Sequence, residues 1–285
     1  MKIIDTTEKM FASFDGMHFD LEKWGTYMDA AIPHAKQLCL DDLRSSAEDG
    51  CSWENDCLPV LNAVITDREK AEKAIQSFHA VTDGLAERIE RRFGRGVDVD
   101  IILYLGLCSG AGWVTTINGR RTILLGIEKI AELDWCDENS MTGLIVHELG
   151  HVYQAQYGRL YCETKSAKER FLWQLFTEGV AMVFEQEITG NPGYYHQDRG
   201  GWKEWCDRNF ERIRDAFSAD AETMTDRNQR YFGDWVQFEG HLDTGYYLGA
   251  RFVRFLTEHD TFDSIIGYGT EAVAGGFERF CGGSA

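Results

Sequence analysis

Residues 139–156 read Asn-Ser-Met-Thr-Gly-Leu-Ile-Val-His-Glu-Leu-Gly-His-Val-Tyr-Gln-Ala-Gln. Apolar side chains recur three or four positions apart in this stretch: Met141, Ile145, Leu149 and Val152. Such spacing predicts an amphipathic helix, and Asn139 or Ser140 is a suitable residue to cap its first turn. We therefore expect a central helix that packs through one apolar face.

The same helix carries the motif His-Glu-x-x-His at residues 147–151. Histidines four positions apart lie one turn apart on one face, so the imidazoles of His147 and His151 can bind one metal ion, with Glu148 beside them. Composition alone supplies about 0.02 copies of the motif in a chain of this length. The histidines also lie off the apolar face, which favours metal ligands over hydrogen-bonded core histidines.

A catalytic zinc ion usually has three protein ligands, so a third must come from elsewhere in the chain. The best candidate is Glu178, on a second helix predicted over 167–188. Its small neighbours Gly179 and Ala181 would let this helix approach the motif helix closely. The alternative is that Glu178 is one of several solvated glutamates.

The first part of the chain is predicted to be helical. Residues 18–48 and 53–65 have helical patterns, and a single amphipathic helix is expected from Thr66 to Phe93, capped by Thr66 or Asp67 and ending at Gly94. We therefore expect an N-terminal helical region over 1–95, which either covers the rest or belongs to the same globule, and a second domain over 96–285.

The pattern changes after Gly96. Residues 97–107 are rich in β-branched and aliphatic side chains and predict a buried strand. Residues 113–117 and 121–125 flank Asn118-Gly119, a dipeptide favoured in tight hairpins. Further helices are predicted in three segments: 202–217, 244–258 and 262–280. The expected fold class is α+β, helix-dominated, with a small sheet before the motif helix.

Composition excludes several classes of partner and site. The chain has 285 residues, with 29 Lys and Arg against 47 Asp and Glu, a net charge of −18. Such an acidic chain is an unlikely partner for nucleic acid, and no apolar run approaches the ~20 residues of a membrane span. The eight cysteines lack Cys-x-x-Cys pairs and are expected to be thiols of a cytoplasmic protein.

These motifs together resemble the gluzincins, zinc peptidases whose ligands are two motif histidines and a downstream glutamate. With Gly245-Tyr-Tyr-Leu-Gly-Ala250, the order over residues 97–270 is similar to bacterial predicted zinc-dependent proteases. The metzincin pattern is absent, because Gln154 and Tyr157 stand where it needs Gly and His. The resemblance implies a zincin-like fold with substrate along an edge strand. Met182 departs from it, because many gluzincins have an aspartate there; Glu185 is a candidate replacement.

The residue types suggest a mechanism. One Zn²⁺ per chain, held by two imidazoles and a carboxylate, would polarise a substrate carbonyl and lower the pKa of a bound water. Glu148 would be the general base. Tyr246 is the first candidate to stabilise the oxyanion, followed by Tyr247 and His241; the alternative is that the tyrosines serve packing.

We expect a zinc-dependent hydrolase that cleaves peptide or protein substrates. Two alternatives remain open at this point. One is a non-catalytic, zinc-stabilised binding or regulatory protein, favoured by the missing aspartate at Met182. The other is a hydrolase of a non-peptide amide or ester that uses the same site.

Overall fold

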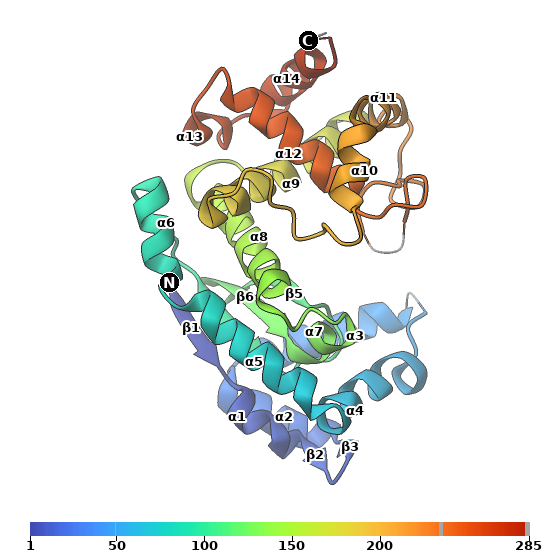
Figure 1. The fold of residues 1–285 in the computed structure, drawn as a ribbon. Helices are drawn as coiled ribbons and strands as arrows, with labels where there is room; N and C mark the ends of the chain where they lie inside the picture. Colours follow the sequence, from blue (N-terminus) through green and yellow to red (C-terminus); the bar gives the residue numbers. More distant parts are fainter. Residues whose placement is uncertain (49, 234–235, 283–285) are drawn as a thin grey trace. The chain divides into compact units, whose positions relative to one another are not determined.

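The computed structural model of the protein describes residues 1–48, 50–233 and 236–282. As predicted, the described chain is α+β and helix-dominated, with a small mixed sheet (Figure 1). It divides into two compact units, Met1–Glu148 and Leu149–Ala285. The division falls inside one continuous helix, α8 (Glu138–Tyr157), so both units share it. The predicted domain boundary near residue 95 remains a prediction.

The first unit contains a four-stranded sheet in the order β1-β4-β6-β5. Its strands are β1 (Lys2–Asp5), β4 (Asp100–Tyr104), β5 (Gly112–Ile117) and β6 (Arg120–Gly126). β1 and β6 are each parallel to β4, whereas β5 is antiparallel to β6 and forms an edge. The predicted hairpin is confirmed: Asn118 and Gly119 have φ values of 51° and 75°, as a type I′ turn requires.

Strand β1 was not predicted. The N-terminal region was expected to be helical, yet Lys2 pairs with Asp100 and Asp5 pairs with Leu103. Strand β4 is also shorter than the predicted strand over 97–107. Residues 2–5 have no alternating pattern to mark a strand, because β1 is specified by its distant partner rather than by its own sequence.

The helices of the first unit are α1 (Thr7–Met10), α2 (Leu21–Ala31), α3 (Ala35–Glu48), α4 (Leu58–Thr66), α5 (Arg68–Thr82), α6 (Leu85–Phe93) and α7 (Ile127–Glu132). Shorter pieces are the 3₁₀ turn Phe11–Ser13, the hairpin of β2 (Phe14–Asp15) and β3 (His18–Phe19), and the π-helical turn Trp53–Cys57.

The prediction of one helix from Thr66 to Phe93 was wrong. The chain forms α5 and α6, which are separated at Gly84, a residue in the left-handed conformation at φ 61°. An uninterrupted apolar period hid this break, in which the extended Asp83 and the left-handed Gly84 both leave the helix. The predicted end at Gly94 is confirmed, with φ 71°.

The cap of helix α8 lies two or three residues before the predicted capping residues Asn139 and Ser140. The carboxylate of Asp137 accepts hydrogen bonds from the backbone N–H groups of Asn139 and Ser140, at 2.9 and 3.0 Å, so Asp137 is the capping residue. In the first unit, the helix packs on the sheet at Gly112, where an added Cβ would lie 2.7 Å from a methyl carbon of Leu144. The predicted apolar face is buried, with Met141 fully inaccessible.

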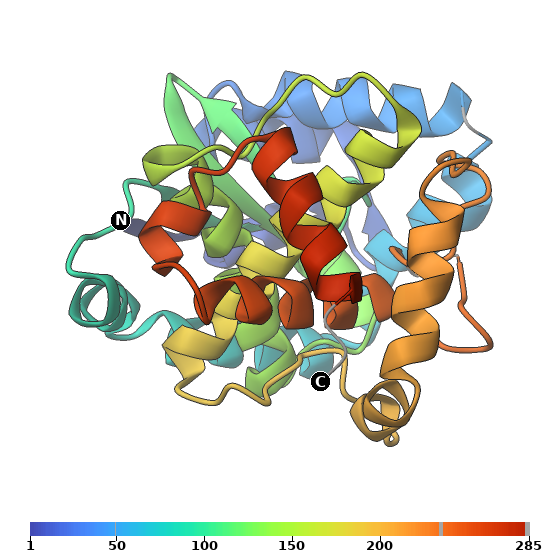
Figure 2. The same ribbon diagram turned by 90° about the horizontal axis from the view of Figure 1, so that it is seen from above.

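The second unit is helical. Its helices are α9 (Ala167–Thr189), α10 (Trp202–Arg208), α11 (Phe210–Asp220), α12 (Thr244–Thr257), α13 (Phe262–Ile265) and α14 (Thr270–Gly282). Helices α9 and α12 form its main contact (Figures 1 and 2). The predicted helices over 202–217 and 262–280 are each divided in two. No helix among the described residues is long and apolar enough to cross a membrane.

Candidate metal centre

The two motif histidines lie on α8, one turn apart. His147 is buried at 7% exposure, and the side chain of His151 is 16% exposed. On another face of the same helix, Ile145 and Leu149 are completely buried. The imidazoles lie off the apolar face, as the sequence pattern predicts. Their own side of the helix is also packed, however, because Gly150 is buried against α9 and Gln154 is fully inaccessible.

Glu178 reaches the motif helix because α8 and α9 approach closely within the second unit. A Cβ at Gly150 would lie only 2.7 Å from the Cα of Ala181, so only glycine fits there. Three residues earlier on α9, Oε2 of Glu178 lies 3.3 Å from Nε2 of His151. The small-residue contact thus brings a carboxylate to the second histidine.

The small neighbours of Glu178 have different roles. Ala181 faces α8, as expected, but Gly179 faces α12: a Cβ at Gly179 would lie 2.2 Å from the backbone oxygen of Gly249. The expectation that both small residues admit the motif helix was therefore wrong for Gly179. Successive positions on a helix are turned by about 100°, so residues two apart cannot face the same neighbour.

The structure brings together the three residues predicted as metal ligands. One ligand atom from each of His147, His151 and Glu178 lies within 4.8 Å of the other two. Ligand atoms about 2.0–2.1 Å from a tetrahedral zinc ion lie about 3.3 Å from one another, and the separation of His151 Nε2 from Glu178 Oε2 has this value, 3.3 Å. Two imidazoles and a carboxylate are also a known zinc donor set, so these residues fit the ion.

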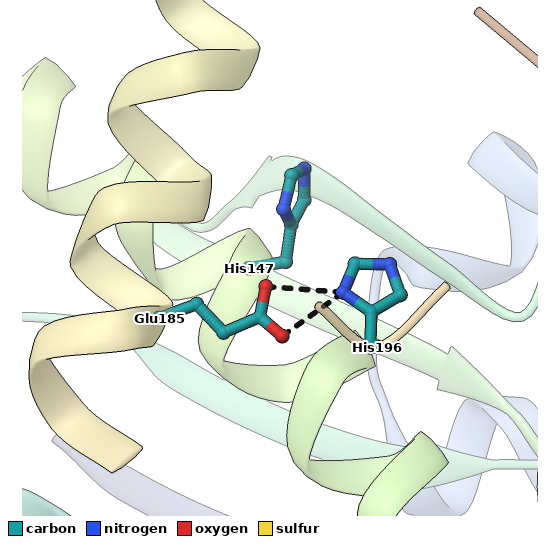
Figure 3. A group of neighbouring side chains, drawn as sticks. All are labelled: His147, Glu185 and His196. Carbon is teal, nitrogen blue, oxygen red and sulfur yellow. Dashed lines mark hydrogen bonds and ion pairs between the residues drawn. The ribbon is translucent and has the colours of Figure 1, made fainter. Parts of the chain in front are cut away.

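A second group of metal-type donors shares His147 (Figure 3). Ligand atoms of His147, Glu185 and His196 lie within 4.8 Å of one another. Nδ1 of His196 lies 3.0 Å from each carboxylate oxygen of Glu185, which is completely buried. A buried carboxylate needs such a partner to offset its lost hydration.

Many gluzincins have an aspartate where this chain has Met182, and Glu185 was predicted to replace it as the partner of a motif histidine. The side chain of Met182 is buried and accepts a contact from Nε2 of Gln197 at 3.8 Å. Glu185, seven positions or two helical turns after Glu178, lies beside the motif histidine His147. Sequence reasoning missed His196, because it follows α9 in an irregular segment with no periodic pattern to mark its function.

The proposed base and oxyanion donors occupy different environments. Glu148 is half-buried on α8. The hydroxyl of Tyr247 is fully buried and donates to Asp207 at 2.9 Å, and burial raises the pKa of Tyr247. His241 stacks on Trp205 with ring centroids 3.7 Å apart. Tyr247 is thus engaged in the interior, which weakens it as an oxyanion donor.

Tyr246, the first candidate, is half-buried and contacts Phe232 edge-on at 5.6 Å between ring centroids. His241 lies outside both donor groups found among the described residues. The roles assigned to Tyr246 and His241 therefore stay predictions.

Comparisons with known proteins give no relative. No family model, curated protein or solved structure matches the chain.

Proposed function

We propose that the protein is a zinc-dependent hydrolase, specifically a gluzincin-like peptidase with a zincin-like fold. The observation that supports this most directly is the convergence of His147, His151 and Glu178 within 4.8 Å. The chain order also agrees: a small sheet, then the motif helix α8, then α9 with the glutamate.

His147, His151 and Glu178 would hold one zinc ion per chain. When bound, zinc supplies a Lewis acid that polarises a carbonyl and lowers the pKa of water. Glu185 and His196 would orient the ring of His147, since carboxylates beside ligating histidines fix the ring and raise its basicity. This role accounts for a carboxylate that is completely buried next to a motif histidine.

Glu148 is the general base in this proposal. Its carboxylate takes a proton from the attacking water and delivers it to the leaving nitrogen. Tyr246 is the proposed hydrogen-bond donor to the oxyanion. For the substrate we propose an extended peptide, because β5 is an edge strand and peptides commonly bind by adding a strand to such an edge.

The test combines metal analysis with cleavage profiling. Purified protein should contain about one zinc per chain, and a peptide library analysed by mass spectrometry should show cleavage. Glu148→Gln should retain zinc and lose cleavage by a factor of at least about 10². Glu138→Gln, an exposed glutamate on the same helix, is the matched control and should keep both. Full cleavage by Glu148→Gln would reject Glu148 as the base.

A second candidate is a non-catalytic zinc-stabilised binding protein. The hydrogen bond from the Tyr247 hydroxyl to Asp207 favours this alternative, because one predicted oxyanion donor already donates to another group. This alternative predicts bound zinc without cleavage of any peptide in the library. A hydrolase of non-peptide amides or esters would show turnover of those substrates only, still dependent on Glu148.

A further inference from the structure

Two thiols of the first unit lie beside each other, in a part of the unit that the proposed hydrolase function does not use. Sγ of Cys51 is 3.6 Å from Sγ of Cys57. Cys51 is half-buried, whereas Cys57 is 2% exposed. A disulfide bond is about 2.05 Å long, so the two sulfur atoms would have to approach by about 1.5 Å.

The backbone holds Cys51 in place at the end of α3. The N–H of Cys51 donates to the carbonyl oxygen of Ser46 at 2.9 Å, and the N–H of Gly50 donates to Ala47 at 3.1 Å. Gly50 has a φ of 104°, which favours glycine. These two bonds form a Schellman-type helix end, so the position of Cys51 is defined by α3.

A compact turn holds Cys57 at the start of α4. Ser52 accepts a hydrogen bond on Oγ from the N–H of Asn55 at 3.2 Å and one on its carbonyl oxygen from the N–H of Cys57 at 3.3 Å. The N–H of Ser52 in turn donates to Asp56 at 2.7 Å. Both cysteines are thus fixed at helix ends, which lowers the entropy lost when they are joined.

The two thiols differ in access. Burial, together with the interaction with Cys51, raises the pKa of Cys57 to about 11. The buried Cys57 therefore stays protonated at neutral pH, whereas an oxidant can reach the partly exposed Cys51. Exchange with an external disulfide needs an accessible attacking thiol, and then a neighbouring thiol to complete it.

We propose that Cys51 and Cys57 form a reversible intramolecular disulfide by exchange with a small-molecule disulfide of the glutathione type. The Cys51 thiolate attacks one sulfur of the oxidant, whose S–S bond breaks and releases one thiolate. Cys57 then loses its proton, and its sulfur attacks the Cys51 sulfur of the mixed disulfide, releasing the second thiolate. The protein loses two electrons and two protons, and the oxidant is reduced to two thiols.

Cys108 lies close enough to Cys57 to offer an alternative pair of thiols, and it therefore provides a control. Its sulfur donates to the backbone oxygen of Cys57 at 3.6 Å, so it is the third thiol of this neighbourhood. Burial raises the pKa of Cys108, and nearby Glu128 raises it further. Both effects disfavour the thiolate, so Cys108 should not compete with Cys51 in exchange.

The test treats the full chain with oxidised glutathione, alkylates the remaining thiols, and identifies linked peptides by mass spectrometry. Wild-type protein should form the Cys51–Cys57 disulfide, which dithiothreitol should reverse. Cys57→Ser should instead trap one glutathione on Cys51, because the thiol that displaces it is absent. Cys108→Ser, the matched control, should leave the rate of disulfide formation unchanged.

A neighbouring thiol acts at an effective concentration of mM or more, so the intramolecular product should exceed intermolecular disulfide by about 10³-fold for protein at µM concentration. A Cys57–Cys108 link would overturn the proposal. So would oxidation of Cys51 that is no faster than that of the partly exposed Cys162 and Cys281. The wild-type rates decide this point even if a variant fails to fold.

Discussion

Substitution of Gly179 by alanine should disrupt the packing of α9 on α12 next to the proposed zinc ligand Glu178. The new Cβ would lie 2.2 Å from the backbone oxygen of Gly249 and 2.5 Å from its carbonyl carbon. Real Cβ atoms essentially never approach closer than 3.0 Å. One backbone must therefore shift by at least about 0.8 Å, since no flexible side chain is available to move instead.

Overpacking of a close-packed interior costs about 1–3 kcal/mol, and a backbone-to-backbone clash belongs at the upper end of this range. About 3 kcal/mol corresponds to a fall of about 6–12 °C in the thermal midpoint of a unit of this size. The shift also moves Glu178, so zinc affinity should fall as well.

The assay is thermal unfolding followed by circular dichroism, together with zinc titration of the zinc-free protein. Gly96→Ala is the matched control, because a Cβ at Gly96 would have no atom within 4 Å. Its free energy of unfolding should stay within about 0.5 kcal/mol of the wild-type value, as expected for an open surface position. If Gly179→Ala unfolds at the same temperature as Gly96→Ala, the close α9–α12 contact is refuted.

Two further substitutions test the motif helix and its surroundings. Hydrogen bonds from Ser140 and Asn139 outweigh the effect of burial and lower the pKa of Asp137 below 3.8; its contribution to stability is therefore present above pH 3.8 and lost as pH falls through the lowered pKa. Asp137→Ala should cost about 1 kcal/mol at neutral pH and less at pH 2, measured by urea unfolding, and Asp137→Asn should retain the cap; a cost as large at pH 2 as at neutral pH would contradict the assignment. Glu185→Gln should lower zinc affinity by about 10–100-fold in a competition titration with a chelator. Glu187→Gln, on the same helix and paired with Arg254, should leave the affinity unchanged, and equal affinities for both variants would reject the positioning role of Glu185.

Features that depend on neighbouring residues could be predicted from the sequence. The prediction of the Asn118-Gly119 turn was correct, because these residues adopt positive φ at little energetic cost in any pair of flanking strands. The separation of His147 and His151 from the apolar face of α8 was also correct, since helical periodicity sets both. Asp83 and Gly84 show the limit of this reasoning, because these two non-helical residues divide α5 from α6 although the apolar period in the sequence continues across them.

Contacts between distant segments could not be read in the same way. The pairing of β1 with β4 joins residues 98 positions apart, and no pattern in residues 2–5 indicates that β4 is the strand they pair with. Glu178 was identified from its small neighbours, but the helix that each neighbour faces became clear only with α9 in place between α8 and α12. His196 joins Glu185 because an irregular segment folds back on α9. Local propensity and periodicity act along the chain, whereas these contacts depend on which surfaces exclude water together, and that is a property of the folded chain.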